Sequence, residues 1–311
     1  MALQILLLIA GLALIVFGAD SLVEGASAIA RKAGISEFVI GLTIVGFGTS
    51  CPELVVSLTG AIQGNADISV GNVVGSNIFN TLLILGMTAV IAPVAVTKSN
   101  RHRDIPIAML VTFLFAFLAL TGQKIGRLEG VAFLLIFVAY MIYCFKSDAG
   151  AASGGEEIRE RSLPVAILLV AAGLAGLIFG GQMFVDNATA IARSLGVSDK
   201  FIAITLLAGG TSLPELATCI VAAARKKDQL ALGNVLGSNV FNILLILGTS
   251  AVVTPLSTAA ITWVDLGAIL ISAVLVWLWT CTGRRDRIDR WEGVVMLLGF
   301  AAYYSYLFVK L

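Results

Sequence analysis

An internal repeat limits the fold of this chain more than any other feature of its sequence. Residues 71–86 and 233–248 are identical at 13 of 16 positions, and the same offset of 162 residues relates GFGTSCPE at 46–53 to AGGTSLPE at 208–215. Agreement over such a length indicates that the two halves of the chain share one architecture. The fold must therefore be built from two similar units.

The composition places both units in a membrane. The chain is 59% hydrophobic and 13% charged, with a mean hydropathy of +1.00, whereas soluble domains carry about 25% charged residues. Ten hydrophobic runs are long enough to cross a bilayer as helices, which predicts an all-α polytopic membrane protein. The expected spans are residues 3–30, 37–62, 68–93, 105–122, 128–146, 163–192, 200–224, 230–254, 261–282 and 291–309.

The number of spans predicts how the two units are oriented. Each repeat holds five spans, and because five is odd, the second repeat must enter the membrane upside down relative to the first. We expect an N-terminal repeat at 1–146, a linker at 147–162 and an inverted C-terminal repeat at 163–311. Of the 20 Lys and Arg residues, 15 fall in loops on one side, which places the linker in the cytoplasm and both termini outside the cell (inner) membrane.

Inverted repeats are typical of transporters, whose binding sites lie near the bilayer midplane on interrupted helices. We expect such interruptions in spans 2, 3, 7 and 8. Pro52 and Pro214 each remove one helical hydrogen bond beside several glycines, which predicts unwound joints in spans 2 and 7. Irregular backbone at membrane depth is tolerated only where it is buried or lines a cavity.

Two carboxylates mark the predicted site. Glu53 and Glu215 each lie inside a hydrophobic span, where an ionised carboxylate costs roughly 2.5–3.5 kcal/mol on insertion scales, so both indicate a functional site. In contrast, Asp20 and Glu24 lie toward the cytoplasmic end of span 1, and we interpret them as polar contacts at the membrane interface or between helices.

Hydroxyl and amide side chains accompany the two carboxylates at helical spacing. A residue four positions before each Glu shares its helix face, and spans 3 and 8 carry a Ser and an Asn four residues apart. Paired glycines in these two spans allow close approach of helix backbones. The residues are Thr49 and Thr211, then Ser76 with Asn80 and Ser238 with Asn242, and the glycine pairs Gly71 with Gly75 and Gly233 with Gly237.

The count of oxygen donors matches calcium. Two carboxylates supply four oxygens and two threonines add two more, which approaches the six to eight oxygens that Ca²⁺ prefers. Softer metals would need thiolate or imidazole ligands. Several Na⁺ ions could neutralise the same two charges, and competition for the carboxylates would then produce exchange. The predicted calcium ligands are Thr49, Glu53, Thr211 and Glu215, and sodium would also use Ser50, Ser76, Ser212, Ser238, Asn80 and Asn242.

The residues alone leave other functions open. A carrier of the same design could be driven by protons, and a passive cation channel could use the same oxygens. An intramembrane hydrolase could use paired acids, but no nucleophile and base pair is apparent. We therefore expect a non-enzymatic protein without a cofactor or nucleic-acid partner, which handles Na⁺ and Ca²⁺ in a lipid bilayer; its oligomeric state is left open.

The paired GTSxPE and GNVxGSNxFN segments resemble the α-repeats of the cation/calcium exchanger family, in particular its prokaryotic sodium/calcium exchangers. The resemblance covers the whole chain. It implies ten spans and sodium-coupled calcium antiport by alternating access, in which spans 1 and 6 slide against spans 2, 3, 7 and 8. It also implies that carbonyl groups near Gly46 and Ala208 contribute to sodium binding.

One position departs from the pattern of this family. Asn242 stands where several prokaryotic members and the potassium-dependent exchangers carry Asp. The asparagine removes a third titratable carboxylate and speaks against potassium co-transport. The proton-coupled calcium exchangers share the ancestry but have a different signature around the acidic residues, so proton coupling ranks second.

Overall fold

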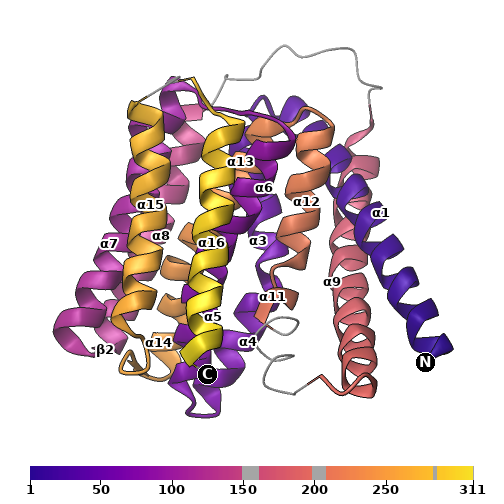
Figure 1. Cartoon of the computed structure of the whole chain (residues 1–311). Helices are drawn as coiled ribbons and strands as arrows, with labels where there is room; N and C mark the ends of the chain where they lie inside the picture. Colours follow the sequence, from indigo (N-terminus) through magenta and orange to yellow (C-terminus); the bar gives the residue numbers. More distant parts are fainter. Residues whose placement is uncertain (149–160, 198–207, 283–285, 311) are drawn as a thin grey trace.

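The computed structural model describes residues 1–148, 161–197, 208–282 and 286–310, and nearly all of them are helical (Figure 1). Within these residues, eight helical segments are long and apolar enough to cross a bilayer. They are α1 (Ala2–Ala33), α5 with η2 and α6 (Ala66–Ile91), η3 with α7 (Asn100–Gly122), α8 (Arg127–Asp148), α9 (Leu163–Ser194), α13 with η5 and α14 (Asp228–Val253), α15 (Trp263–Cys281) and α16 (Arg290–Lys310).

A ninth segment spans as a bent pair of helices. Its first half joins α2 (Glu37–Ile40), the π-helix η1 (Gly41–Val45) and α3 (Gly46–Thr49), and its second half is α4 (Cys51–Ile62), inclined by 49°. Of the expected span at residues 200–224, the structure describes only α11 (Ala208–Gly210) and α12 (Leu213–Ala224), because residues 198–207 lie outside the described part. The two termini lie at the same end of the molecule (Figure 1), as an even number of spans requires.

The repeat in the sequence reappears as a repeat of element lengths. Helices α1 and α9 each have 32 residues, α4 and α12 each have 12, and α5 and α13 each have 13. Spans 3 and 8 are interrupted by π-helical turns rather than by breaks, at η2 (Phe79–Leu85) and η5 (Phe241–Leu247). The predicted interruption of these two spans therefore takes the form of an altered hydrogen-bond pattern within a continuous helix.

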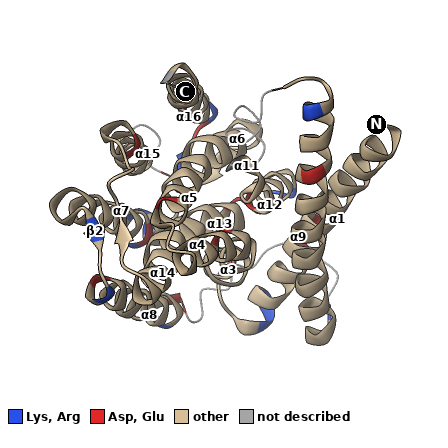
Figure 2. Cartoon of the chain, turned by 90° about the horizontal axis from the view of Figure 1, so that it is seen from below, with Lys and Arg blue, Asp and Glu red and all other residues tan. Residues whose placement is uncertain are grey.

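Helices α1 and α9 form a separate pair at one side of the other helices (Figure 2). Their backbones touch along a seam of small residues spaced by seven, where a Cβ atom added to a glycine would lie within 3.0 Å of the other helix. The two helices are antiparallel, so residues later in α1 face residues earlier in α9. The opposed residues are Gly11 with Gly180, Gly18 with Gly173, and Gly25 with Ala166.

The glycine pair of span 8 also permits a close approach, as predicted. A Cβ atom on Gly233 or Gly237 would overlap the carbonyl oxygen of Phe38 or Leu42, so α13 lies directly against α2 and η1. For Gly71 and Gly75, no described atom lies within 4 Å of an added Cβ. The residues related to Phe38 and Leu42 by the repeat are 200 and 204, which are outside the described residues.

Two short antiparallel ladders join the repeats at opposite loops. Strand β1 (Val94–Ala95) pairs with β4 (Arg287–Ile288), and β2 (Lys124–Ile125) pairs with β3 (Leu256–Ser257). Each ladder connects one loop of the first repeat to one loop of the second. The ladders therefore connect the ends of the two repeats to each other.

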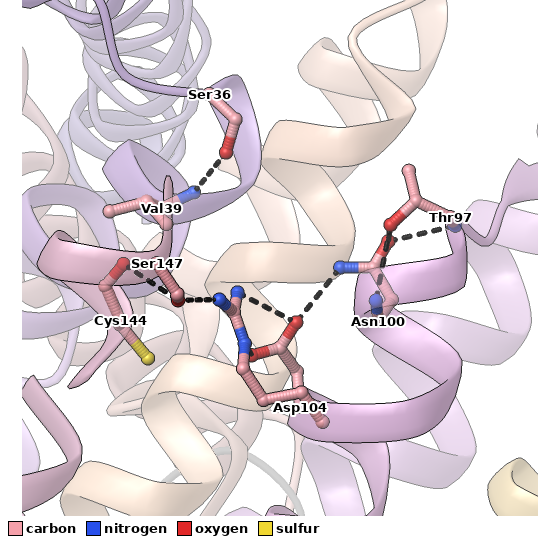
Figure 3. A network of polar contacts seen from close by, with 8 residues as sticks. Ser36, Val39, Thr97, Asn100, Asp104, Cys144 and Ser147 are labelled. Carbon is pink, nitrogen blue, oxygen red and sulfur yellow. Dashed lines mark hydrogen bonds and ion pairs between the residues drawn. The ribbon is translucent and has the colours of Figure 1, made fainter. Parts of the chain in front are cut away.

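A buried polar network lies where η3 (Asn100–Asp104) meets the end of α8 (Figure 3). Arg103 and Asp104 form an ion pair of 2.7 Å, and Asn100 donates a hydrogen bond of 3.2 Å to the same carboxylate. Nearby, Asp148 accepts a hydrogen bond of 3.1 Å from the backbone N–H of Ser36, at the start of α2. This end of the bent span is thus tied to the end of α8.

Candidate functional site

The predicted joints lie at two serines in equivalent positions. The backbone angles are φ −83° and ψ 6° at Ser50, and φ −91° and ψ 7° at Ser212, so neither residue continues the preceding helix. Pro52 and Pro214 fall in the first turn of the helices that follow, where a missing N–H costs nothing. The prolines therefore begin a new helix in the middle of each span, as the sequence predicts for span 2 and, within its described half, for span 7.

The two joints exchange hydrogen bonds across the repeats. The hydroxyl of Ser50 donates to Oε1 of Glu215 at 3.0 Å, and the hydroxyl of Ser212 donates to Oε1 of Glu53 at 3.0 Å. Both carboxylates are 1% exposed. The structure thus brings the two copies of the motif together around a single buried cluster.

Several oxygens of the predicted site residues are buried without a hydrogen-bond partner in the described structure. They include Oε2 of both glutamates, Oδ1 of Asn80 and Asn242, and Oγ1 of Thr211. A buried acceptor left unpaired costs about 1–3 kcal/mol, and more when it is charged. Four of these five atoms can only accept, as long as the carboxylates are ionised. A cation would satisfy such a set of oxygens.

The remaining predicted residues lie around the two joints. The hydroxyl of Ser76 is 3.4 Å from that of Ser212, and the hydroxyl of Ser238 donates to the carbonyl oxygen of Gly46 at 3.5 Å. Thr49 is fully buried, and its hydroxyl lies 3.0 Å from the carbonyl oxygen of Val45. Ala208, the last of the predicted residues, begins α11.

Three further asparagines were missed by the sequence analysis. Asn234 lies 3.2 Å from the hydroxyl of Thr49, and Asn72 donates to the backbone oxygen of Glu53 at 3.2 Å. Asn77 accepts a hydrogen bond of 2.9 Å from the amide of Asn242. All three belong to the repeated GNVxGSN segment, so the identity of the two copies was the signal that could have found them.

The donor set suits a hard cation that is bound reversibly. In the parts of the chain that the structure describes, no group of three or more His, Cys, Asp and Glu side chains is placed to hold a metal. The cluster offers two carboxylates and otherwise neutral oxygens. Such ligands favour Na⁺ or Ca²⁺ over transition metals, which prefer imidazole or thiolate.

The chain is similar to known membrane proteins, among them sodium/calcium exchangers. The family model described as "Sodium/calcium exchanger protein" matches residues 3–146 and 165–309. Sodium/calcium exchanger MaX1 of Methanosarcina acetivorans is 35% identical over 97% of this chain and 98% of its own length. Inner membrane protein YrbG of Escherichia coli is 34% identical over 99% of this chain and 98% of its own length.

A solved structure agrees over the same length. The sodium-calcium exchanger NCX_Mj, soaked with zero Na⁺ and Ca²⁺, superimposes with a TM-score of 0.87 and 32% identity. The match covers 98% of this chain and 99% of that structure. The likeness therefore extends over both repeats and includes the bent span.

Proposed function

The chain belongs to the sodium/calcium exchanger family, and we propose that it is an antiporter that exchanges Na⁺ for Ca²⁺ across the membrane by alternating access. It is a multi-pass membrane protein of a transporter family. The observation that carries the proposal is the reciprocal pair of serine to glutamate bonds, which leaves one oxygen of Glu53 and one of Glu215 buried and without a partner among the described residues.

Calcium would bind between the two glutamates. Each carboxylate is held through Oε1 by a serine of the other repeat, so Oε2 is free to bind the ion. Two negative charges match one Ca²⁺, and the oxygens of Thr49 and Thr211 extend the ligand set. Sequence and burial together support this assignment of Thr49, Glu53, Thr211 and Glu215.

Sodium would use the same carboxylates together with the neutral oxygens around them. The hydroxyl protons of Ser50 and Ser212 are directed to the glutamates, so the lone pairs of these hydroxyls remain available to a cation. The further sodium ligands or lining residues of our proposal are Ser76, Asn80, Ser238, Asn242 and the carbonyl groups of Gly46 and Ala208.

Exchange follows from the charge of the empty site. Two buried carboxylates without counter-ions would carry a large desolvation cost across the hydrophobic part of the membrane. Binding of Ca²⁺ or of Na⁺ removes that cost, so the loaded forms change conformation more readily than the empty form. Coupled exchange is then favoured over leak, and the protein needs no cofactor.

The two repeats occupy unequal positions, which supports alternating access. Helix α1 packs along α12, whereas the equivalent pair, α9 and α4, has no comparable contact in the described structure. Asp20 of α1 forms an ion pair with Arg225, which follows α12. In our proposal, α1 closes one end of the site in this arrangement, and exchange of the two arrangements between the repeats would open it.

We further propose that both termini face the extracytoplasmic side of the cell (inner) membrane. The unequal distribution of Lys and Arg supports this orientation, and the relative named as an inner membrane protein supports the choice of membrane. The repeats would extend over 1–146 and 163–311, with the linker 147–162 in the cytoplasm.

Transport in proteoliposomes tests the function. Vesicles containing the protein and loaded with Na⁺ would be diluted into sodium-free buffer, and uptake of radioactive calcium would be followed, with potassium and pH varied separately. We expect uptake that requires the outward sodium gradient and ignores potassium. Uptake driven by a proton gradient without sodium would instead establish the proton-coupled carrier, and single-channel conductance would establish a channel.

A further inference from the structure

We propose that Asn77 is a positioning residue that turns the amide of Asn242 so that its oxygen, and not its nitrogen, faces the transported cation. The inference rests on the proposed function, because it assigns a task to a residue that contacts Asn242, one of the proposed sodium ligands. Both side chains are buried, with exposed fractions of 2% for Asn77 and 0% for Asn242.

The direction of the Asn77 amide is fixed by a backbone carbonyl group. Nδ2 of Asn77 lies 3.2 Å from the backbone oxygen of Asn239. A carbonyl oxygen can only accept, so the atom of Asn77 that faces it must be the NH₂ group. The Oδ1 atom of Asn77 is consequently turned the other way, toward Asn242.

The orientation of the Asn77 amide determines the orientation of the Asn242 amide. Oδ1 of Asn77 accepts a hydrogen bond of 2.9 Å from Nδ2 of Asn242. Only the NH₂ end of Asn242 can make this bond, so its Oδ1 is directed elsewhere. That oxygen is buried and has no hydrogen-bond partner in the described structure, as expected for an atom reserved for a cation.

An asparagine at position 242 creates the need for such a partner. The two ends of a carboxamide have nearly the same shape, but the NH₂ end carries a partial positive charge and repels a cation. A carboxylate at the same place would present an oxygen in either rotation. Asn77 therefore removes an ambiguity that exists only while residue 242 is an amide.

The other repeat lacks this arrangement, and the sequence explains why. Asn239 is the equivalent of Asn77, but its Nδ2 donates at 2.8 Å to the hydroxyl of Thr81. The residue equivalent to Thr81 is Ile243, which offers no acceptor to Asn77. The two asparagines thus have different tasks, and Asn239 provides a matched control.

The test compares four variants of the reconstituted full-length protein: Asn77→Ala, Asn239→Ala, Asn242→Asp, and Asn77→Ala combined with Asn242→Asp. The readout is the concentration of Na⁺ or Ca²⁺ that half-saturates exchange, with the maximal rate measured in parallel. Losing one net hydrogen bond in the site should raise the half-saturating concentration about 3- to 10-fold in Asn77→Ala. In Asn239→Ala, the half-saturating concentration should stay within about twofold of that of the unmodified protein. The side chain of Asn239 bonds to Thr81 and not to Asn242, so its loss should not be coupled to ion binding.

The background of Asn242→Asp separates positioning from a structural role. There, adding Asn77→Ala should change the half-saturating concentration by less than about twofold, since a carboxylate needs no orientation. The inference would be overturned if Asn77→Ala raised the half-saturating concentration equally with and without Asn242→Asp, or if the protein failed to fold in both cases. So would equal behaviour of Asn77→Ala and Asn239→Ala, whereas absence of sodium-dependent calcium uptake in the unmodified protein would refute the proposed function itself.

Discussion

The hydroxyl of Ser212 lies 3.0 Å from Oε1 of Glu53, although 159 residues separate the two along the chain. Ser50 makes the equivalent bond to Glu215. Each repeat therefore supplies the carboxylate that the other repeat orients, and neither half can complete the site alone. The cross-over makes the cation site a property of the interface between the repeats.

Neutralising either glutamate should abolish calcium exchange to the same extent. Glu53→Gln and Glu215→Gln each remove one charge and one strong ligand, which corresponds to about 3 kcal/mol or more, hence roughly a 100-fold weaker affinity for Ca²⁺. The affinity can be measured by binding of radioactive calcium to purified protein. Glu37→Gln serves as the control, because Glu37 pairs with Lys227 at the start of α2. A Glu37 variant as defective as the other two would contradict the assignment.

The seam between α1 and α9 should tolerate no added methyl group. In Gly173→Ala, the new Cβ would lie 2.6 Å from the backbone nitrogen of Leu22, so the helices must separate. Gly181 lies in the same helix, but no described atom is within 4 Å of its added Cβ. Gly181→Ala should therefore stabilise the protein by up to about 1 kcal/mol through helix propensity.

Thermal unfolding in detergent compares the two variants of α9. We expect a lower midpoint for Gly173→Ala and an equal or higher midpoint for Gly181→Ala. Equal midpoints would show that the close approach of the helices does not depend on glycine.

The buried ion pair at the start of α7 should matter for stability but not for ion affinity. Asp104→Ala leaves the charge of Arg103 unpaired in a buried position, at a cost of about 3–5 kcal/mol. The pair of Arg287 and Asp289 is equally short but more exposed, so Asp289→Ala should cost less than about 1 kcal/mol. Unfolding midpoints measure both effects, and a similar loss in the two variants would argue against the role of burial.

The contact between Asp20 and Arg225 should bias the conformational equilibrium. This pair has no charged counterpart in the other half, since the equivalent residues are Gln182 and Gln63. Arg225→Gln should therefore reduce the population closed by α1, because it removes an attraction that only this conformation has. Distances between spin labels on α1 and α12 would report the shift.

A charge reversal controls the experiment on Asp20 and Arg225. Exchange of the two residues, Asp20→Arg with Arg225→Asp, should restore the population of the closed form. High salt should weaken the difference, because both side chains are partly exposed. Label distances that do not respond to the loss of Arg225 would refute the bias.

Much of the fold could be predicted because the signals are local or repeated. Hydrophobic runs located the spans, the offset of 162 residues paired the repeats, and Pro52 with Pro214 located the joints. Asp20 and Glu24 each form an ion pair with a residue outside α1, which agrees with their interpretation as polar contacts: Asp20 pairs with Arg225 after α12, and Glu24 pairs with Arg161 before α9.

The rest depends on packing that a single sequence does not reveal. Which serine orients which glutamate depends on how the inverted halves dock, and periodicity within one span carries no such information. The π-helical turns at η2 and η5 also lack a compositional signal, since their residues form an ordinary apolar run. From the sequence we placed Arg103 and Asp104 in a loop, but in the structure both are buried and belong to the helical segment Asn100–Gly122.

The position of the bound cation tests the account most directly. Crystals of the protein soaked with Sr²⁺, which replaces Ca²⁺ and scatters anomalously, would be examined for anomalous difference density. We predict one dominant peak within about 2.7 Å of both Glu53 Oε2 and Glu215 Oε2, slightly beyond the 2.3–2.6 Å typical of calcium. A dominant peak that contacts neither glutamate, or only one of them, would contradict a site shared by the two repeats.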